Sequence, residues 1–195
     1  EPELPETPRY EPFFAYRVSP LAAFGVIVAG LSTATFGSVG PIFAIAVGLD
    51  LSQIALFLVV SVIGGMISQV PAGILADRLS RRSVLLVYSI IASALCLTMM
   101  LPIMDLRVMD IPLVYVMSFL FGLTTYPIYS ICAAHASDFV ESDRMISLSA
   151  SLIFLYASGA IISPLVAGWI IDSFGAPMMF SLISAAHLSL MLYTV

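Results

Sequence analysis

Six long stretches of the chain carry no charged residue, and they set the predicted architecture. Their lengths are 32, 26, 22, 27, 27 and 23 residues. A helix needs about 20 apolar residues to cross the roughly 30 Å hydrocarbon core of a bilayer. The pattern therefore predicts six transmembrane helices at about residues 19–48, 52–76, 83–104, 111–138, 145–171 and 176–195.

Continuous apolar runs exclude a transmembrane β-barrel, whose strands alternate lipid-facing and lumen-facing residues. The composition agrees with helices in lipid: 61% of residues are hydrophobic, 10% are charged, and the mean hydropathy is +1.09. A soluble domain carries about 25% charged residues. Cys96 and Cys132 both lie in apolar runs, where free thiols pack as small hydrophobic groups. The sequence is that of an all-α membrane protein.

Residues 1–18 differ from the rest because they contain four glutamates and four prolines. This composition predicts a cytoplasmic acidic and proline-rich linker, and not a signal peptide, which would have a basic start and a short apolar core. Since the chain begins without methionine, we expect it to be part of a longer protein. The net charge of −5 gives no indication of nucleic-acid binding.

The arginines predict the orientation in the membrane. Only Arg107 falls on one side of the six predicted spans, whereas the other six basic residues fall on the opposite side: Arg9, Arg17, Arg78, Arg81, Arg82 and Arg144. Basic residues are enriched in cytoplasmic loops. We therefore expect a multi-pass protein of the bacterial inner (plasma) membrane with both ends of this chain in the cytoplasm.

Two short sequence echoes relate the first three spans to the last three. The segment Gly73–Asp77 closes the second span and Gly168–Asp172 closes the fifth, while Pro41 and Pro127 each precede an isoleucine and an aromatic residue in spans one and four. Matching spans have opposite predicted orientation, which is the property of a 3+3 inverted repeat. Chance is the alternative explanation, because Gly and Pro are common in membrane helices.

The loop between the second and third spans carries the most informative motif. Residues 73–85 read GILADRLSRRSVL and resemble the signature loop of the major facilitator superfamily, G-x-L-A-D-R-x-G-R-[RK]-x-x-[LIM]. The chain departs from that pattern at Ser80, where glycine is usual, and at Leu79, where an aromatic residue is common. A plain basic loop would explain the arginines but not Gly73 and Asp77.

The resemblance implies half of a facilitator fold and a cytoplasmic gate, in which this loop latches against the other six-helix half and stabilises one access state. The gate residues are expected to be Gly73, Asp77, Arg78, Arg81, Arg82 and Asp138. Asp77 is positioned to face the positive N-terminus of a neighbouring helix. Arg81 or Arg82 is expected to pair with Asp138 at the end of the fourth span.

The acidic and proline-rich linker of residues 1–18 resembles the cytoplasmic loop that joins the two halves of proteins of this superfamily. The segment 159–168 resembles the Gly-Pro helix of exporters, with Ser163 where glycine is usual. That exporter motif belongs to the first half of the superfamily fold, and the corresponding segment of the second half follows it less strictly. Because Ser163 departs from the motif, we favour the C-terminal half, spans seven to twelve.

The resemblance also implies that the first and fourth spans line a central cavity, flanked by the second and fifth. The expected cavity residues are Ser32, Thr35, Phe36, Gln69, Thr125, Tyr126, Tyr129 and Tyr156. Such a cavity is aromatic and weakly polar, suited to a neutral or amphipathic organic solute. The alternative for each hydroxyl is a simple hydrogen bond between helices, worth about 0.6 kcal/mol.

Asp138 stands at the very end of the fourth predicted span, and no other Asp, Glu, Lys or Arg lies within a predicted span, so histidine is the remaining candidate for proton coupling at depth. His187 lies near the middle of the last span and is a possible proton site. His135 lies three residues before Asp138 and is expected to pair with it.

We expect a secondary active or facilitative transporter working by alternating access, with membrane lipid, the N-terminal six-helix half (on the same or a separate chain) and a small organic substrate as partners. The alternative is a non-transporting subunit that serves as a scaffold, or as a lipid-binding or pigment-binding accessory of a larger complex. The chain has no HExxH pair and no acidic cluster at depth for a metal or for acid–base chemistry, so neither an enzyme nor a cofactor is predicted. An ion channel would need an acidic ring or a filter sequence, and neither is present.

Overall fold

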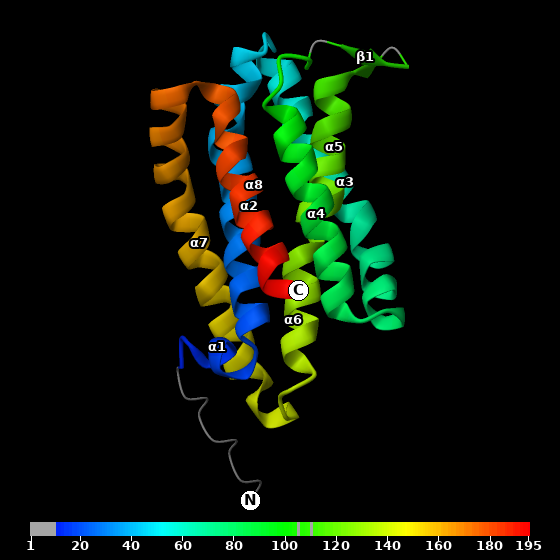
Figure 1. Cartoon of the computed structure of the whole chain (residues 1–195), viewed down its shortest axis with the longest axis vertical. Helices are drawn as coiled ribbons and strands as arrows, with labels where there is room; N and C mark the ends of the chain where they lie inside the picture. Colours follow the sequence, from blue (N-terminus) through cyan, green and yellow to red (C-terminus); the bar gives the residue numbers. More distant parts are fainter. Residues whose placement is uncertain (1–10, 105, 110) are drawn as a thin grey trace, which may run out of the picture.

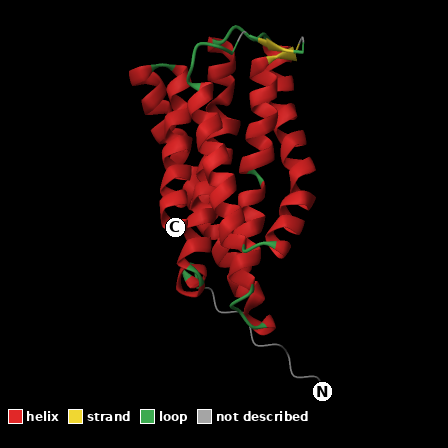
Figure 2. Cartoon of the chain, turned by 45° about the vertical axis from the view of Figure 1, so that its right-hand side comes forward, coloured by secondary structure: helices red, strands yellow, loops and turns green. Residues whose placement is uncertain are grey.

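A computed structural model describes residues 11–104, 106–109 and 111–195. Within these residues, six helical spans are long and apolar enough to cross a membrane (Figure 1, Figure 2), which confirms the predicted all-α membrane fold. They are formed by α2 (Pro20–Ala46), α3 (Leu51–Arg78), α4 (Arg81–Met99), α5 (Leu113–Thr125) with α6 (Pro127–Ser137), α7 (Met145–Phe174) and α8 (Met179–Thr194).

The remaining elements are short and lie at the ends of the bundle. They are α1 (Phe14–Val18), the 3-10 turns η1 (Ser142–Arg144) and η2 (Ala176–Met178), and the strands β1 (Arg107–Val108) and β2 (Ile111–Pro112). The strands pair antiparallel between α4 and α5, and Figure 2 shows this hairpin at the end of the bundle away from the N-terminus.

Side-chain caps fix where the long helices begin. Asp50 accepts a hydrogen bond from the Gln53 backbone N–H (2.9 Å), and the Gln53 side chain accepts one from the Asp50 N–H (2.9 Å). This reciprocal capping box satisfies two helix N–H groups that have no partner within α3. Hydrogen bonds from the Ser52 hydroxyl and the Gln53 backbone lower the pKa of the Asp50 carboxyl, because they stabilise its ionised form.

The fourth span is divided, where the sequence predicted one helix over residues 111–138. α5 ends at Thr125 and α6 begins at Pro127, because proline has no N–H to donate to the preceding turn. Tyr126 between them keeps helical backbone angles (φ −63°, ψ −36°), so α6 continues in line with α5 (Figure 1).

The described arginines separate between the two ends of the bundle. In Figure 1, α1, the α3–α4 turn and the α6–α7 connection lie toward one end, and β1 lies at the other. Arg78 and Arg81 flank the α3–α4 turn and Arg144 precedes α7, whereas Arg107 belongs to the hairpin. Arg9 lies outside the described residues.

Helix pairing follows the symmetry of a 3+3 repeat. α2 packs most extensively on α7, α3 on α5, and α4 on α8. Exchanging the first three spans for the last three converts the α2–α7 pair into the α5–α3 pair and leaves the α4–α8 pair unchanged. The pairing therefore supports the inverted repeat that the sequence echoes predict.

Reciprocal glycines allow the two symmetry-related pairs to approach closely. A Cβ on Gly30 of α2 would overlap the Tyr156 carbonyl of α7, and one on Gly159 of α7 would overlap the Ile27 carbonyl of α2. Gly64 and Gly122 have the same relation across the α3–α5 crossing, where each faces a backbone carbonyl of the partner helix. Small residues drive membrane helix packing in this way because lipid offers no hydrophobic force between helices.

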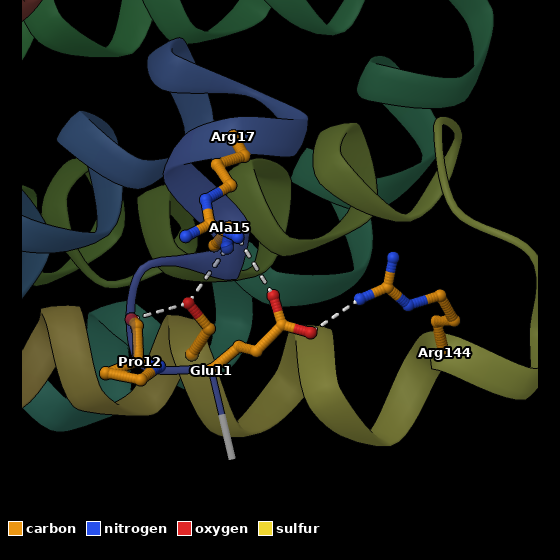
Figure 3. Close-up of polar contacts among 6 residues, drawn as sticks. Glu11, Pro12, Ala15, Arg17 and Arg144 are labelled. Carbon is orange, nitrogen blue, oxygen red and sulfur yellow. Dashed lines mark hydrogen bonds and ion pairs between the residues drawn. The ribbon is translucent and has the colours of Figure 1, made fainter. Parts of the chain in front are cut away.

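Residues 11–18, here called the N-terminal strap, fold back onto the start of α7 (Figure 3). Glu11 pairs with Arg17 (Oε2–Nη1, 3.1 Å) and with Arg144 (Oε1–Nη2, 2.9 Å). The Arg144 guanidinium also lies 4.0 Å from the centre of the Phe14 ring. Part of the predicted linker 1–18 is thus ordered against the bundle, while residues 1–10 lie outside the described part of the chain.

A buried hydroxyl completes the attachment of the strap. Ser151 of α7 accepts a hydrogen bond from the Ala15 backbone N–H (2.9 Å) and donates one to the Pro12 carbonyl (2.8 Å). Ser151 is 1% exposed and Ala15 is fully buried. Since buried backbone groups without partners are costly, this serine fixes where the strap lies.

Candidate functional site

The signature loop places one arginine between two carboxylates. Arg81 Nη1 lies 3.1 Å from Asp138 Oδ2 at the end of α6, and Arg81 Nη2 lies 3.6 Å from Asp77 Oδ1 in the last turn of α3. The Arg81 side chain is 21% exposed, against 72% for Asp77 and 50% for Asp138. Three spans are therefore joined at this end of the bundle by charge.

The other loop residues have distinct surroundings. Arg82 donates a hydrogen bond to the Thr194 carbonyl at the end of α8, and Arg78 is exposed. Ser80 accepts from the Ser83 N–H (3.0 Å) and caps α4, which explains how serine replaces the usual glycine there. No atom of the described residues lies within 4 Å of a Cβ built on Gly73, so packing against them does not require glycine there.

A cavity of about 350 Å³ lies between α2, α3, α7 and the α5–α6 junction. It brings together four residues that the sequence assigned to a substrate cavity: Gln69, Tyr126, Tyr129 and Tyr156. The remaining lining residues are Ala29, Thr33, Ser130 and Ile153. Its walls are apolar and aromatic with a few hydroxyl and amide groups, as is typical of small-molecule sites.

Two of the lining polar residues, Thr33 and Ser130, escaped the sequence analysis. Thr33 Oγ1 lies 2.7 Å from the Tyr156 hydroxyl, and Ser130 donates to Gln69 Oε1 (3.0 Å). Ser130 lies four residues after Tyr126 and so shares its helix face, a spacing that was visible in the sequence. α2 carries apolar residues on all sides, so nothing in its sequence distinguishes Thr33 from its neighbour Ser32.

The other four predicted cavity residues do not line this cavity. Ser32 is bonded to His187 Nε2 (3.2 Å), and Phe36 stacks on the Phe121 ring with centroids 4.3 Å apart. Thr35 and Thr125 are fully buried, and their hydroxyls have no hydrogen-bond partner among the described residues. The rotation of α2 and α5 about their axes turns these side chains toward the interior of the helix bundle.

The histidines occupy different environments. His187 is fully buried in α8, and its Nδ1 has no hydrogen-bond partner within the described part of the chain. The His135 ring packs edge-on against Phe139, with centroids 5.2 Å apart. Among residues 11–104, 106–109 and 111–195, no three His, Cys, Asp or Glu side chains gather as metal ligands would.

Sequence comparison with protein families decides the identity of this bundle. The family described as the Major Facilitator Superfamily matches residues 22–195. The chain belongs to this superfamily. Facilitator proteins are membrane transporters and not enzymes, so the predicted family and the expected lack of enzymatic activity are confirmed.

The chain is similar to curated proteins that bear the name of MFS-type transporters. The chain is 24% identical over 179 residues to an uncharacterized MFS-type transporter of Enterobacter sp. (strain 638), covering 89% of the chain and 43% of the relative. It is 27% identical over 157 residues to the uncharacterized MFS-type transporter YfkF of Bacillus subtilis (strain 168), covering 79% and 38%. The chain spans about two fifths of the length of these relatives. No solved structure matches it.

Proposed function

We propose that this chain is one half of a transporter that moves a small organic solute across the membrane by alternating access. The cavity between α2, α3, α7 and the α5–α6 junction carries this proposal. It lies between the two helix pairs that the repeat relates, α2–α7 and α3–α5, where a relative movement of the pairs would change its shape. Its volume of about 350 Å³ suits a small solute, since ligand sites measure about 300–1,000 Å³.

The charged cluster of Asp77, Arg81 and Asp138 is proposed as the cytoplasmic latch. It joins the ends of α3 and α6 to the start of α4. Gly73 and Gly168, which correspond in the sequence echo, both leave open space on this chain. A close approach by helices of another six-helix half would account for glycine at both positions.

We further propose that this half is the C-terminal one, that both ends of the chain are cytoplasmic, and that the membrane is the bacterial plasma membrane. The acidic and proline-rich composition of residues 1–18 suits a connection between halves, the described arginines favour the α1 end as cytoplasmic, and the similar proteins come from bacteria. The other half would belong to the same polypeptide or to a separate one. His187 is proposed only as a candidate for proton coupling.

Two-sided labelling of the cavity tests transport directly. Cys96 and Cys132 are first replaced by alanine in the full-length protein, and Ser130, an exposed residue of the cavity wall, is replaced by cysteine. A membrane-impermeant maleimide is applied to right-side-out and inside-out vesicles. Alternating access predicts labelling of Ser130→Cys from both sides.

A matched control is Leu165→Cys, because Leu165 is 74% exposed on the apolar surface of α7 and should be labelled from neither side. A non-transporting subunit with a static cavity would be labelled at Ser130→Cys from one side only, or from neither if lipid fills the cavity. Either result would overturn the transporter proposal.

A further inference from the structure

Three tyrosine side chains line the cavity, and the rings of two of them are nearly perpendicular. The Tyr129 and Tyr156 centroids lie 5.5 Å apart with an interplanar angle of 84°. The Tyr126 ring lies directly on the backbone of Gly65 in α3, where a Cβ would come within 2.8 Å of its ring atoms. The three rings, here called the tyrosine cage, thus come from α6, α7 and the residue between α5 and α6.

A hydrogen bond to α2 holds one ring of the tyrosine cage. The Tyr156 hydroxyl lies 2.7 Å from Thr33 Oγ1, and either oxygen can be the donor in that contact. Thr33 Oγ1 also lies 2.8 Å from the Ala29 carbonyl and 3.3 Å from the Gly30 carbonyl, both in its own helix. The Tyr156 phenol is thereby attached to α2 at the cavity wall.

The charge of the cavity wall gives an indication of the solute class. Among the described residues that line it, none is Asp, Glu, Lys or Arg. A carboxylate or phosphate solute would find no cationic side chain among them. Aromatic faces attract cations instead, and quaternary ammonium groups are recognised by aromatic cages.

We propose that the tyrosine cage binds a small organic cation of the quaternary ammonium type. This inference rests on the proposed function, because it names the solute class of the same cavity. Tyr126, Tyr129 and Tyr156 line the cavity and would supply the aromatic groups. Gln69 and Ser130, which bond to each other at the cavity wall, supply polar atoms for a hydroxyl or similar group on the solute.

Binding of an isosteric pair of probes to the full-length protein provides the test. Choline and 3,3-dimethylbutanol have nearly the same shape, but only choline carries a positive charge. Isothermal titration is expected to give at least about tenfold tighter binding of choline, which corresponds to about 1.4 kcal/mol. Equal affinities, or no binding of choline, would overturn the proposal.

Substitutions of Tyr129 then distinguish the contribution of the aromatic ring to choline binding from that of the hydroxyl. Tyr129→Phe retains the aromatic face and is expected to keep choline affinity within about twofold, whereas Tyr129→Leu should weaken it at least about tenfold. The control is Tyr193→Leu, since Tyr193 is 51% exposed and packs on Phe24 outside the cavity. Equal losses in the Phe and Leu variants would assign binding to the hydroxyl and contradict the cage.

The labelling experiment keeps this inference distinct from the proposed function. Two-sided labelling of Ser130→Cys, with no labelling of Leu165→Cys, shows that a variant is folded, and choline should protect the cysteine at position 130 more than 3,3-dimethylbutanol does. Two-sided labelling with equal protection by the two probes would leave the transporter standing and refute the cage. Labelling from one side only would refute the transporter proposal, regardless of how strongly choline protects the cysteine.

Discussion

At the scale of single residues, Arg81 is the point where three spans meet. Its guanidinium contacts Asp77 of α3 and Asp138 at the end of α6, while its own backbone starts α4. Exposed ion pairs contribute only about 0–1 kcal/mol to stability. We therefore infer that the ion pairs of Arg81 contribute little to folding and instead favour one relative position of the helices. A small free energy is enough to shift such an equilibrium.

Removing one charge of this cluster should alter gating and leave folding intact. Asp77→Asn is expected to change the melting temperature little, because Asp77 is 72% exposed, and to shift Ser130→Cys labelling toward the cytoplasmic side as the latch loosens. The vesicle labelling ratio measures this. Asp77→Glu, which keeps the charge, is the control, and an unchanged ratio in Asp77→Asn would refute the gating role.

A second residue-scale prediction concerns the glycine crossings. Gly122→Ala should destabilise the protein by about 1–3 kcal/mol, the usual cost of overpacking, because the added methyl would overlap the Ser61 carbonyl. Thermal unfolding in detergent measures the loss. Gly37→Ala is the matched control, since no atom lies within 4 Å of its added Cβ, and it should be neutral or slightly stabilising. Equal melting temperatures for the two variants would contradict close packing at Gly122.

At the scale of elements, the N-terminal strap joins the chain before α2 to the beginning of α7. α2 and α7 also form the most extensive helix pair, so α1, α2 and α7 behave as one packed unit. Charge at Glu11 and a buried hydroxyl at Ser151 hold the strap by separate means. Of the two, the buried contact dominates, because the ion pairs are partly exposed to solvent.

Loss of the buried hydroxyl should release the strap. Ser151→Ala leaves the buried Ala15 N–H without its partner, at a cost of about 1–3 kcal/mol, so cleavage by trypsin after Arg17 should become about 5- to 150-fold faster. Ser149→Ala, at an exposed position of the same helix, should leave cleavage unchanged. Glu11→Gln should have a smaller effect than Ser151→Ala. Equal cleavage rates in Ser151→Ala and the unmodified protein would show that the serine does not hold the strap.

At the scale of the whole molecule, uncharged runs made the six spans predictable, because span length is set by bilayer thickness. The family was predictable from one loop, since Gly73, Asp77 and the spaced arginines are a rare combination. The rotation of each helix was not predictable: α2 is apolar on all sides, so Thr33 and Ser32 looked alike although one reaches the cavity and the other bonds to His187. The helix break before Pro127 has a local cause, the missing N–H of proline. The place of the Tyr126 ring depends instead on its packing against Gly65 of α3, which is distant in the sequence.

The charge-free interior of the described spans has an electrical consequence. Moving one elementary charge through a membrane potential of 100 mV involves about 2.3 kcal/mol. Charged side chains of the described spans lie at their ends, as Asp77 and Arg81 do, so rearrangement of these helices carries no fixed charge through the field. Any current would then come from the solute, a coupling ion or the rest of the protein. For a cationic solute, a negative cell interior would by itself favour entry and oppose export, so export would need coupling to another gradient.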